Sequence, residues 1–465
     1  MFEVSGNIES YKSDLQELIN QFELDNYNIF ISCKNEKECE VLVKFNDYEF
    51  LYKYDAVFCD DKLLFDRLLK HNVKSSLYKT LSKKCNKKLA WGSLTGVRPA
   101  RLVYNSIAKN NSNVKDAVDI IKKQYFISPK KSDLLLKVVE NQVKVVKNDD
   151  SYCFYVHIPI CPTRCVYCSF VSTDFAHAHL YLDKYVEYLR QEIDFIIDLI
   201  KQKNIKINSI YVGGGTPTVM SAEQLQYVLK PLKDLKVSEF TVECGRADTI
   251  TEQKLKVLND LKVSRISINP QTFNDKVLEN IGRKHTAIQV IEAFNLARKF
   301  SFDINMDFIA GLPGDNLANF KSSIDKAIRL VPENITIHTL SIKNAGLLKH
   351  MNNAELSTAV TVQKMLDYAS KKLKENNYEP YYLYRQKNML GFFENVGYSK
   401  PEKYCLFNIY SMEDLKPVIA CGAGAISKKI HKQNNYIERI ANVKQISDYI
   451  SRFDEMLKRK KDLLS

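Results

Sequence analysis

The sequence predicts an α/β fold in which six βα units form an open, partial barrel, with a small α+β module before it and a mainly helical region after it. Two observations support this prediction. Between residues 152 and 345, six apolar, strand-like runs alternate with helical segments, a pattern typical of right-handed βαβ crossovers and a parallel sheet. A closed eight-stranded barrel needs about 250 residues. This region has only about 190, so the barrel should stay open.

The elements of the barrel follow one another at regular spacing. The expected strands are 153–158, 209–215, 239–245, 264–270, 303–311 and 334–340. The expected helices are 181–200, 221–235, 251–261, 287–300 and 317–331. In parallel folds, ligands bind at the carboxyl ends of the strands. The functional residues should therefore lie where these runs end.

The flanking regions have different patterns. Residues 1–146 predict an α+β module of unknown role, with a helix at 7–23, strands at 27–34, 39–46 and 48–55, and helices from residue 60 onwards. A polar connector follows at 147–152. The last region contains a helix at 358–376, an aromatic run at 378–398, a glycine turn at 421–427 and a terminal helix. We therefore expect three domains, 1–146, 152–345 and 346–465.

The composition is that of a globular protein in a reducing compartment. The start of the chain has no basic segment followed by an apolar core, and the most apolar helical stretch carries several charges, so neither a signal peptide nor a membrane span is expected. Eleven cysteines then indicate free thiols or metal ligands in the cytoplasm. The net charge of +13 fits a nucleic acid, a polyanionic small molecule or simply a solvated basic surface, and does not choose among them.

Three cysteines, Cys161, Cys165 and Cys168, lie in the loop after the first barrel strand. Structural zinc needs four protein ligands, and His157 is a possible fourth, although it belongs to the strand. Three unrelated buried cysteines are the other alternative. A cubane iron–sulfur cluster can be held by three cysteines, which leaves one iron open for a small chelating ligand. The spacing and the place in the fold favour the cluster.

Polar and glycine residues follow the other barrel strands. Gly213, Gly214 and Gly215 close the second strand, and a glycine triplet lets the backbone approach a ligand closely. Four more candidates fall at or just beyond the third, fourth and fifth strands: Glu243, Gln271, Arg283 and Asp307. Each of these could be a helix cap, a turn or a surface ion pair. Their shared position instead favours one site for a zwitterionic ligand that carries a ribose.

The CxxxCxxC loop in this setting resembles the radical S-adenosylmethionine (SAM) superfamily. The resemblance implies a 4Fe–4S cluster bound by the three cysteines and SAM bound to its open iron. It also implies that "GGGTP", including Thr216, binds the methionyl part of SAM, and that Tyr155, counted as catalytic, lies beside the sulfonium. Glu243, Gln271, Arg283 and Asp307 would be further SAM contacts.

A longer set of motifs resembles one family within that superfamily, the oxygen-independent coproporphyrinogen III oxidases, also called coproporphyrinogen dehydrogenases. The motifs are "YVHIPICPTRC", "GGGTPT", "RISINPQTFND", "GRKHT", "DFIAGLPG" and "GAGAIS". Outside them, "LTGVRPARL" and "YYLYRQKNMLGFFENVGY" resemble the HemZ-type branch.

The resemblance implies an oxidoreductase of heme (porphyrin) biosynthesis. It would decarboxylate two propionates of coproporphyrinogen III oxidatively, giving protoporphyrinogen IX and consuming two SAM. A flavodoxin- or ferredoxin-like donor would supply electrons, and neither a nucleic acid nor a membrane would be a partner. The region 346–465 would cover the substrate, with Arg385 and Lys387 as candidate contacts.

Two departures from the family pattern keep an alternative open. Phe170 stands where the best-known members have a further cysteine, and the same ending occurs in a related heme-chaperone branch. Arg246 and Ala247 stand near the position where a proline is common, three residues after Glu243. A heme-binding or heme-trafficking protein on the same scaffold is therefore the second hypothesis, and a radical SAM methyltransferase or heme-ring opener is a distant third. The N-terminal module and "YRQKNM" favour the oxidase.

Overall fold

The computed structural model describes residues 1–96, 98–168, 173–342, 357–386, 389–431 and 436–464. The chain divides into two compact units, Met1–Val139 and Glu140–Ser465. The three domain ranges expected from the sequence remain predictions, since this division neither separates 152–345 from 346–465 nor falls at the connector.

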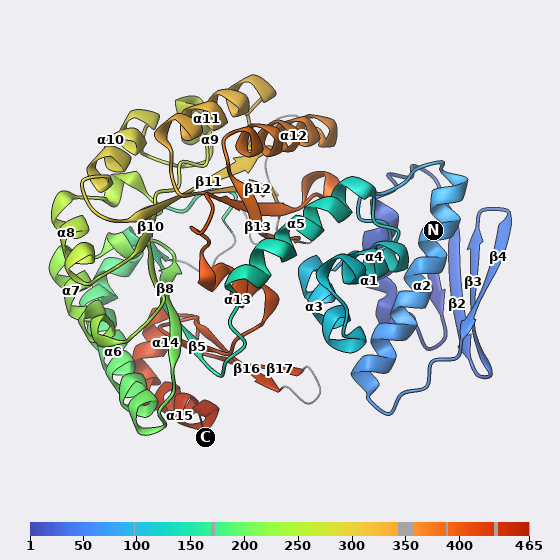
Figure 1. The fold of residues 1–465 in the computed structure, drawn as a ribbon, viewed down its shortest axis with the longest axis horizontal. Coiled ribbons are helices and arrows are strands. Elements are labelled where there is room, and N and C mark those ends of the chain that lie inside the picture. Colours follow the sequence, from blue (N-terminus) through green and yellow to red (C-terminus); the bar gives the residue numbers. More distant parts are fainter. Residues whose placement is uncertain (97, 169–172, 343–356, 387–388, 432–435, 465) are drawn as a thin grey trace. The chain divides into compact units, whose positions relative to one another are not determined.

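The first unit pairs a four-stranded sheet with helices (Figure 1). Its strands are β1 (Phe2–Ser5), β2 (Ile29–Asn35), β3 (Glu38–Phe45) and β4 (Tyr48–Asp55), and they lie in that order in the sheet. Its helices include α1 (Lys12–Asn20), α2 (Lys62–Lys84), α3 (Pro99–Asn110) and α4 (Val114–Tyr125); α5 (Pro129–Val145) continues into the second unit.

The core of the first unit follows from the alternation along β3. Cys39, Val41 and Val43 point inward at every second position and pack with Leu15 of α1 and Leu77 of α2. Asp61 caps α2, because its side chain accepts hydrogen bonds from the backbone N–H groups of the first turn.

The second unit contains the predicted parallel sheet. Within the described residues, six parallel strands lie side by side in the order β12, β11, β10, β9, β8, β5. Their bounds are β5 (Tyr152–Ile158), β8 (Ile207–Gly214), β9 (Glu239–Glu243), β10 (Arg265–Ser267), β11 (Asp303–Ala310) and β12 (Asn334–Thr339). The predicted fold class is confirmed, and all six carboxyl ends meet at one edge of the sheet.

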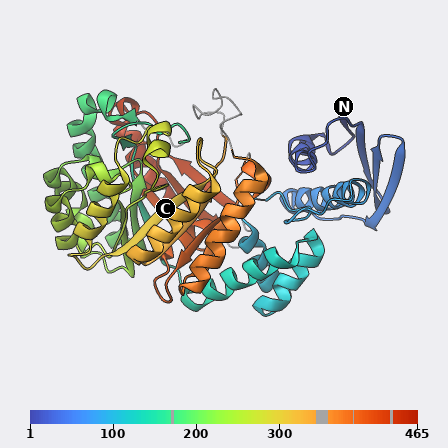
Figure 2. The same cartoon turned by 90° about the horizontal axis from the view of Figure 1, so that it is seen from above.

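Helices connect successive strands and lie along the outer face of the sheet (Figures 1 and 2). They are α6 (Phe175–Gln202), α7 (Ala222–Leu229), α8 (Glu252–Asp260), α9 (Asp275–Asn280), α10 (Ala287–Ala297) and α11 (Leu317–Leu330). Capping boxes start α7 at Ser221 and α10 at Thr286. None of the helices in the described part of the chain is both long and apolar enough to cross a membrane.

The region after residue 346 contains strands as well as the predicted helices. Its helices are α12 (Ala359–Glu375), α13 (Leu406–Glu413), α14 (Ile446–Ser451) and α15 (Phe453–Leu464). Its strands are β13 (Glu379–Tyr384), β14 (Asn395–Ser399), β15 (Val418–Cys421), β16 (Ile426–His431) and β17 (Tyr436–Ala441).

These strands extend the sheet at both edges: β14 runs antiparallel to β12, and β15 runs parallel to β5. The predicted helices are present, and the sequence analysis did not identify these strands. The strands are only four to six residues long, too short for a reliable periodicity signal. The pairings that join β14 and β15 to the barrel are with strands far away in the sequence.

Candidate active site

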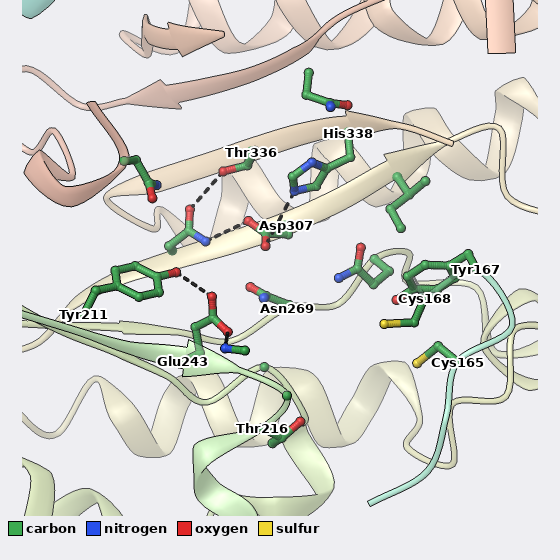
Figure 3. Close-up of a pocket in the computed structure, with 18 of the residues that line it drawn as sticks. Cys165, Tyr167, Cys168, Tyr211, Thr216, Glu243, Asn269, Asp307, Thr336 and His338 are labelled. Atoms are coloured by element: carbon green, nitrogen blue, oxygen red, sulfur yellow. Dashed lines mark hydrogen bonds and ion pairs between the residues drawn. The ribbon is translucent and has the colours of Figure 1, made fainter. Parts of the chain in front are cut away.

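One pocket of about 630 Å³ lies at the carboxyl ends of the barrel strands (Figure 3). It gathers most of the site residues that the sequence predicts. Those that line it are Tyr155, Cys161, Cys165, Cys168, Gly214, Gly215, Thr216, Glu243, Gln271, Arg283 and Asp307. Residues separated by up to 152 positions in the chain are thus brought to one cavity by the parallel sheet.

The three cysteines lie together in the loop after β5. All three are partly exposed and line the pocket, whereas Cys153 on β5 and Cys244 just after β9 are fully buried. The backbone N–H of Cys168 donates to the carbonyl of Cys165 at 3.0 Å, and the Thr216 hydroxyl lies 3.6 Å from the Cys161 sulfur. Among the described residues, no three His, Cys, Asp or Glu side chains converge closely enough to hold a single metal ion. A cubane does not need such convergence, because each thiolate binds a different iron.

Arg283 links the cysteine loop to the strand ends. One guanidinium nitrogen donates to the backbone carbonyls of Asn269 (2.6 Å) and Gly245 (3.2 Å), and the other donates to the Tyr167 hydroxyl at 3.2 Å. Burial alone would lower the pKa of Arg283, but Tyr167 and Cys165 nearby raise it above its usual range. The charge therefore stays on the arginine and faces the thiols.

Glu243 ends β9 and is held by two donors (Figure 3). The Tyr211 hydroxyl donates to Oε1 at 2.6 Å, and the Gly214 N–H donates to Oε2 at 3.2 Å. Burial raises the pKa of Glu243 to about 7, with Asp307 adding to the rise and the two hydrogen bonds opposing it. Gly213 lies beneath this carboxylate: a Cβ there would come within 2.7 Å of Glu243 Cδ, so the position has room only for glycine.

Asp307, on β11, is held by a different set of partners. Asn305 donates its amide to Oδ1 at 2.8 Å, and His338 Nε2 lies 3.7 Å from Oδ2. The other His338 nitrogen is 3.2 Å from the Tyr384 hydroxyl. Burial alone would raise the pKa of Asp307, but His338 and Asn305 lower it below the usual value. Asp307 is therefore an ionised acceptor at neutral pH.

Two buried amide oxygens in the pocket have no donor in the described part of the chain. Neither Gln271 Oε1 nor Asn269 Oδ1 has a hydrogen-bond partner among the described residues, and both side chains line the pocket. An unsatisfied buried acceptor is costly. A ligand that carries ammonium or hydroxyl groups would satisfy both, so the residues present fit SAM. Gln271 also has a left-handed backbone (φ 66°), which is unusual outside glycine and is held by backbone bonds between Gln271 and Asp307 and between Ile309 and Gln271.

An aromatic wall closes one side of the pocket. Tyr155, Tyr211 and Phe407 stack on one another, with ring centroids 4.6 to 6.1 Å apart. Burial and the charge of Glu243 raise the pKa of Tyr155, so its phenol stays protonated. His157, the possible zinc ligand, hydrogen bonds through Nδ1 to the Ala423 carbonyl at 2.5 Å and packs its ring against Gly214. Gly214 therefore lies against one side of the imidazole.

Arg385, one of the two predicted substrate contacts, does not line the pocket. Arg385 is buried and donates to the Phe392 carbonyl at 3.0 Å, whereas its neighbours Tyr384 and Gln386 line the pocket. Alternation along the extended chain explains this difference, because neighbouring side chains point to opposite faces. Lys387 lies outside the described residues.

Several pocket residues were missed by the sequence analysis. Tyr211, Asn269, His338 and Phe407 all take part in the contacts above. Tyr211, Asn269 and His338 stand at or near strand ends, and that position was the one available signal. Phe407 belongs to α13, and nothing in its local sequence marks it.

Comparison with known proteins agrees with this geometry. Residues 155–327 match the radical SAM superfamily. The HemZ protein of Bacillus subtilis, described as oxygen-independent coproporphyrinogen-III oxidase-like, is 38% identical over 375 residues, which cover 78% of this chain and 75% of HemZ. A heme chaperone, HemW of Lactococcus lactis, is 32% identical over 260 residues, covering 52% of this chain and 66% of HemW. The solved structure of coproporphyrinogen III oxidase (HemN) from Escherichia coli shares the fold, with a TM-score of 0.53 at 19% identity over 68% of this chain and 72% of that chain.

The fold, the cysteine loop and these matches define the chain as a radical SAM protein, and the cofactors of that superfamily are a 4Fe–4S cluster and SAM. Within the superfamily, the chain belongs to the family of oxygen-independent coproporphyrinogen III oxidase-like proteins that includes HemZ.

Proposed function

We propose that this protein is an oxygen-independent coproporphyrinogen III dehydrogenase of heme biosynthesis. It would convert two propionates of coproporphyrinogen III to vinyl groups, releasing two CO₂ and consuming two SAM. The observation that carries the proposal is the extent of the HemZ match, which covers 78% of the chain at 38% identity, compared with 52% at 32% for the heme chaperone.

The cofactor site would be built from the residues that the sequence predicts. Cys161, Cys165 and Cys168 would hold the cluster. SAM would be held by the following residues: Tyr155, Gly213, Gly214, Gly215, Thr216, Glu243, Gln271, Arg283 and Asp307. When bound, the reduced cluster and SAM together supply the radical that removes a hydrogen atom from substrate.

The chain's own residues orient the ligand and exclude water. Ionised Asp307 and the free acceptor on Gln271 offer hydrogen-bond partners to ammonium or ribose hydroxyl groups. Glu243 would do so in its ionised form, which a cationic ligand favours. The stacked rings of Tyr155, Tyr211 and Phe407 form an apolar wall that water does not enter readily.

The substrate has four carboxylates, and a buried carboxylate must be paired. Two cationic side chains that the sequence analysis did not single out, Arg164 and Lys428, line the pocket. They, and the overall net charge of +13, suit a polyanionic substrate. Each cleavage of SAM consumes one electron, so we expect a flavodoxin- or ferredoxin-like donor. Each substrate radical gives up one electron as CO₂ leaves and the vinyl group forms, so the reaction also needs a one-electron acceptor.

A second candidate function is heme binding or trafficking, supported by the similarity to HemW chaperones. One experiment separates the two. Purified, cluster-loaded protein is mixed anaerobically with reductant, SAM and coproporphyrinogen III, and the products are identified by mass. Loss of two carboxyl groups supports the dehydrogenase. Tight heme binding without any decarboxylated product, whichever donor is supplied, supports the chaperone and rejects the dehydrogenase.

A further inference from the structure

Arg246 occupies a position where the family pattern commonly has a different residue, and its side chain makes specific hydrogen bonds. It follows β9 by three residues, and its side chain is 3% exposed. The guanidinium binds Asp248 through two parallel hydrogen bonds of 2.9 Å, from Nε to Oδ1 and from Nη2 to Oδ2. This bidentate geometry fixes the plane of the guanidinium and therefore the direction of its remaining N–H groups.

The remaining nitrogen of Arg246 reaches the cysteine loop. Nη1 donates to the Thr163 hydroxyl at 2.9 Å, and that hydroxyl donates in turn to the Gly282 carbonyl at 3.1 Å. Thr163 lies between Cys161 and Cys165. The hydroxyl thus has both an acceptor and a donor, and it joins the residues after β9, the cysteine loop and the residues after α9.

The neighbourhood of this contact leaves the loop little freedom. The Val166 N–H donates to the Ile281 carbonyl at 3.2 Å, and a Cβ on Gly282 would lie 3.3 Å from the Arg164 carbonyl oxygen. Asp248 is itself held by His285 Nδ1 at 3.2 Å. Although burial raises the pKa of Asp248, the bonds from His285 and Arg246 keep it well below its usual value, so the carboxylate stays charged.

We propose that Arg246 is a positioning residue for the cluster-binding loop: Asp248 fixes the guanidinium, and Arg246 fixes Thr163 so that the thiols on either side of Thr163 are held in place. The inference rests on the proposed assignment of Cys161, Cys165 and Cys168 as cluster ligands. Only arginine can make the bidentate pair and the third bond together, because lysine lacks the planar fork.

The test measures how long the reconstituted cluster survives, without substrate or SAM. Wild-type protein and the variants Thr163→Val, Thr163→Ser, Arg246→Lys and Arg246→Lys/Thr163→Val are loaded with iron and sulfide. Each is then mixed with an iron chelator, and cluster loss is followed by absorbance. The electron paramagnetic resonance spectrum of each reduced cluster is also recorded.

Thr163→Val keeps the shape of the side chain but removes the hydroxyl, and with it the bond from Arg246 and the bond to Gly282. We expect this variant to lose its cluster roughly tenfold faster or more, since the bond from Arg246 is charge-assisted. Arg246→Lys should do the same, and both should alter the spectrum. Thr163→Ser keeps the hydroxyl and should behave like wild type. The double variant should be no worse than Thr163→Val alone, because Thr163→Val already removes the bond to Arg246.

Different outcomes identify which assumption is wrong. If Thr163→Val holds its cluster as long as wild type, or if the double variant shows the product of the two single effects, the positioning role is rejected while the cluster assignment stands. If wild-type protein takes up no iron, the assignment of the cysteines is rejected, and this inference with it.

Discussion

The two sides of the pocket hold their functional groups in different ways. On one side, the three thiols stand on a loop, are partly exposed and depend on side chains from other segments, Arg246 and Arg283 among them. On the other side, Glu243 and Asp307 stand on strands (Figure 3). Glu243 is held by hydrogen bonds from the neighbouring strand β8, and Asp307 by a hydrogen bond from Asn305 of its own strand β11. Because different residues hold the two sets of groups, we expect that mutations can impair SAM binding without loss of iron.

The largest expected effect lies on the cysteine side. Cys165→Ala should abolish the cluster, because the loss of one thiolate leaves an iron without a protein ligand. Cys161→Ala and Cys168→Ala should do the same. Iron and sulfide content after anaerobic reconstitution measures this. Cys85→Ala, in the first unit, is the control and should keep wild-type iron; full iron in Cys165→Ala would contradict the assignment.

A smaller effect is expected on the strand side. Asp307→Asn or Glu243→Gln should weaken SAM binding by roughly tenfold or more, since a hydrogen bond to a charged group is worth about 1.5–3 kcal/mol. The cluster should remain, because neither residue would contact iron. Calorimetry on cluster-loaded protein gives the affinity. Glu223→Gln, exposed on α7, is the matched control, and unchanged SAM affinity in both pocket variants would remove them from the site.

The pH dependence of stability sharpens the contrast between the two carboxylates. Burial raises the pKa of Glu243 to about 7 from the usual 4.5, so between these pH values the folded protein binds more protons than the unfolded chain. Its contribution to stability is therefore present below about pH 4.5 and is lost as the pH rises to 7. Asp307, whose pKa is lowered, contributes in the opposite direction: its stabilisation is lost on acidification.

Thermal unfolding of the apoprotein between pH 4.5 and 7 tests the Glu243 contribution. Glu243→Gln should remove part of the fall in melting temperature across this range, because glutamine does not titrate. If wild type and Glu243→Gln show the same dependence of melting temperature on pH, the Glu243 carboxyl group does not titrate between pH 4.5 and 7.

The smallest effect is expected for Tyr211→Phe. This change removes the donor to Glu243 Oε1 and keeps the aromatic stack. The pKa of Glu243 should rise further, because the hydrogen bond from Tyr211 lowers it in the wild type. SAM affinity should still rise with pH, but the midpoint of that rise should lie at a higher pH than in wild type. The affinity reached at high pH should change little. A titration of SAM affinity against pH, with wild type alongside, shows whether the midpoint moves.

Much of this site could be predicted from local sequence patterns. The alternation of strands and helices fixes a parallel sheet, and a parallel sheet places all its carboxyl ends together, so Cys161, Gly214, Glu243 and Asp307 had to meet. The spacing of the three thiols on one short loop could also be recognised from the sequence. These features depend on chain direction and on neighbours in the sequence.

Only the tertiary structure decided which partners complete the site. Phe407 reaches the pocket from α13, and Arg246 reaches Thr163 across 83 positions, because the sheet and its helices bring distant segments into contact. The same limit explains Arg385, which the local sequence placed beside the substrate but whose side chain binds the Phe392 carbonyl instead. Strand periodicity defines two faces, but which face meets the pocket depends on packing between segments far apart in the chain.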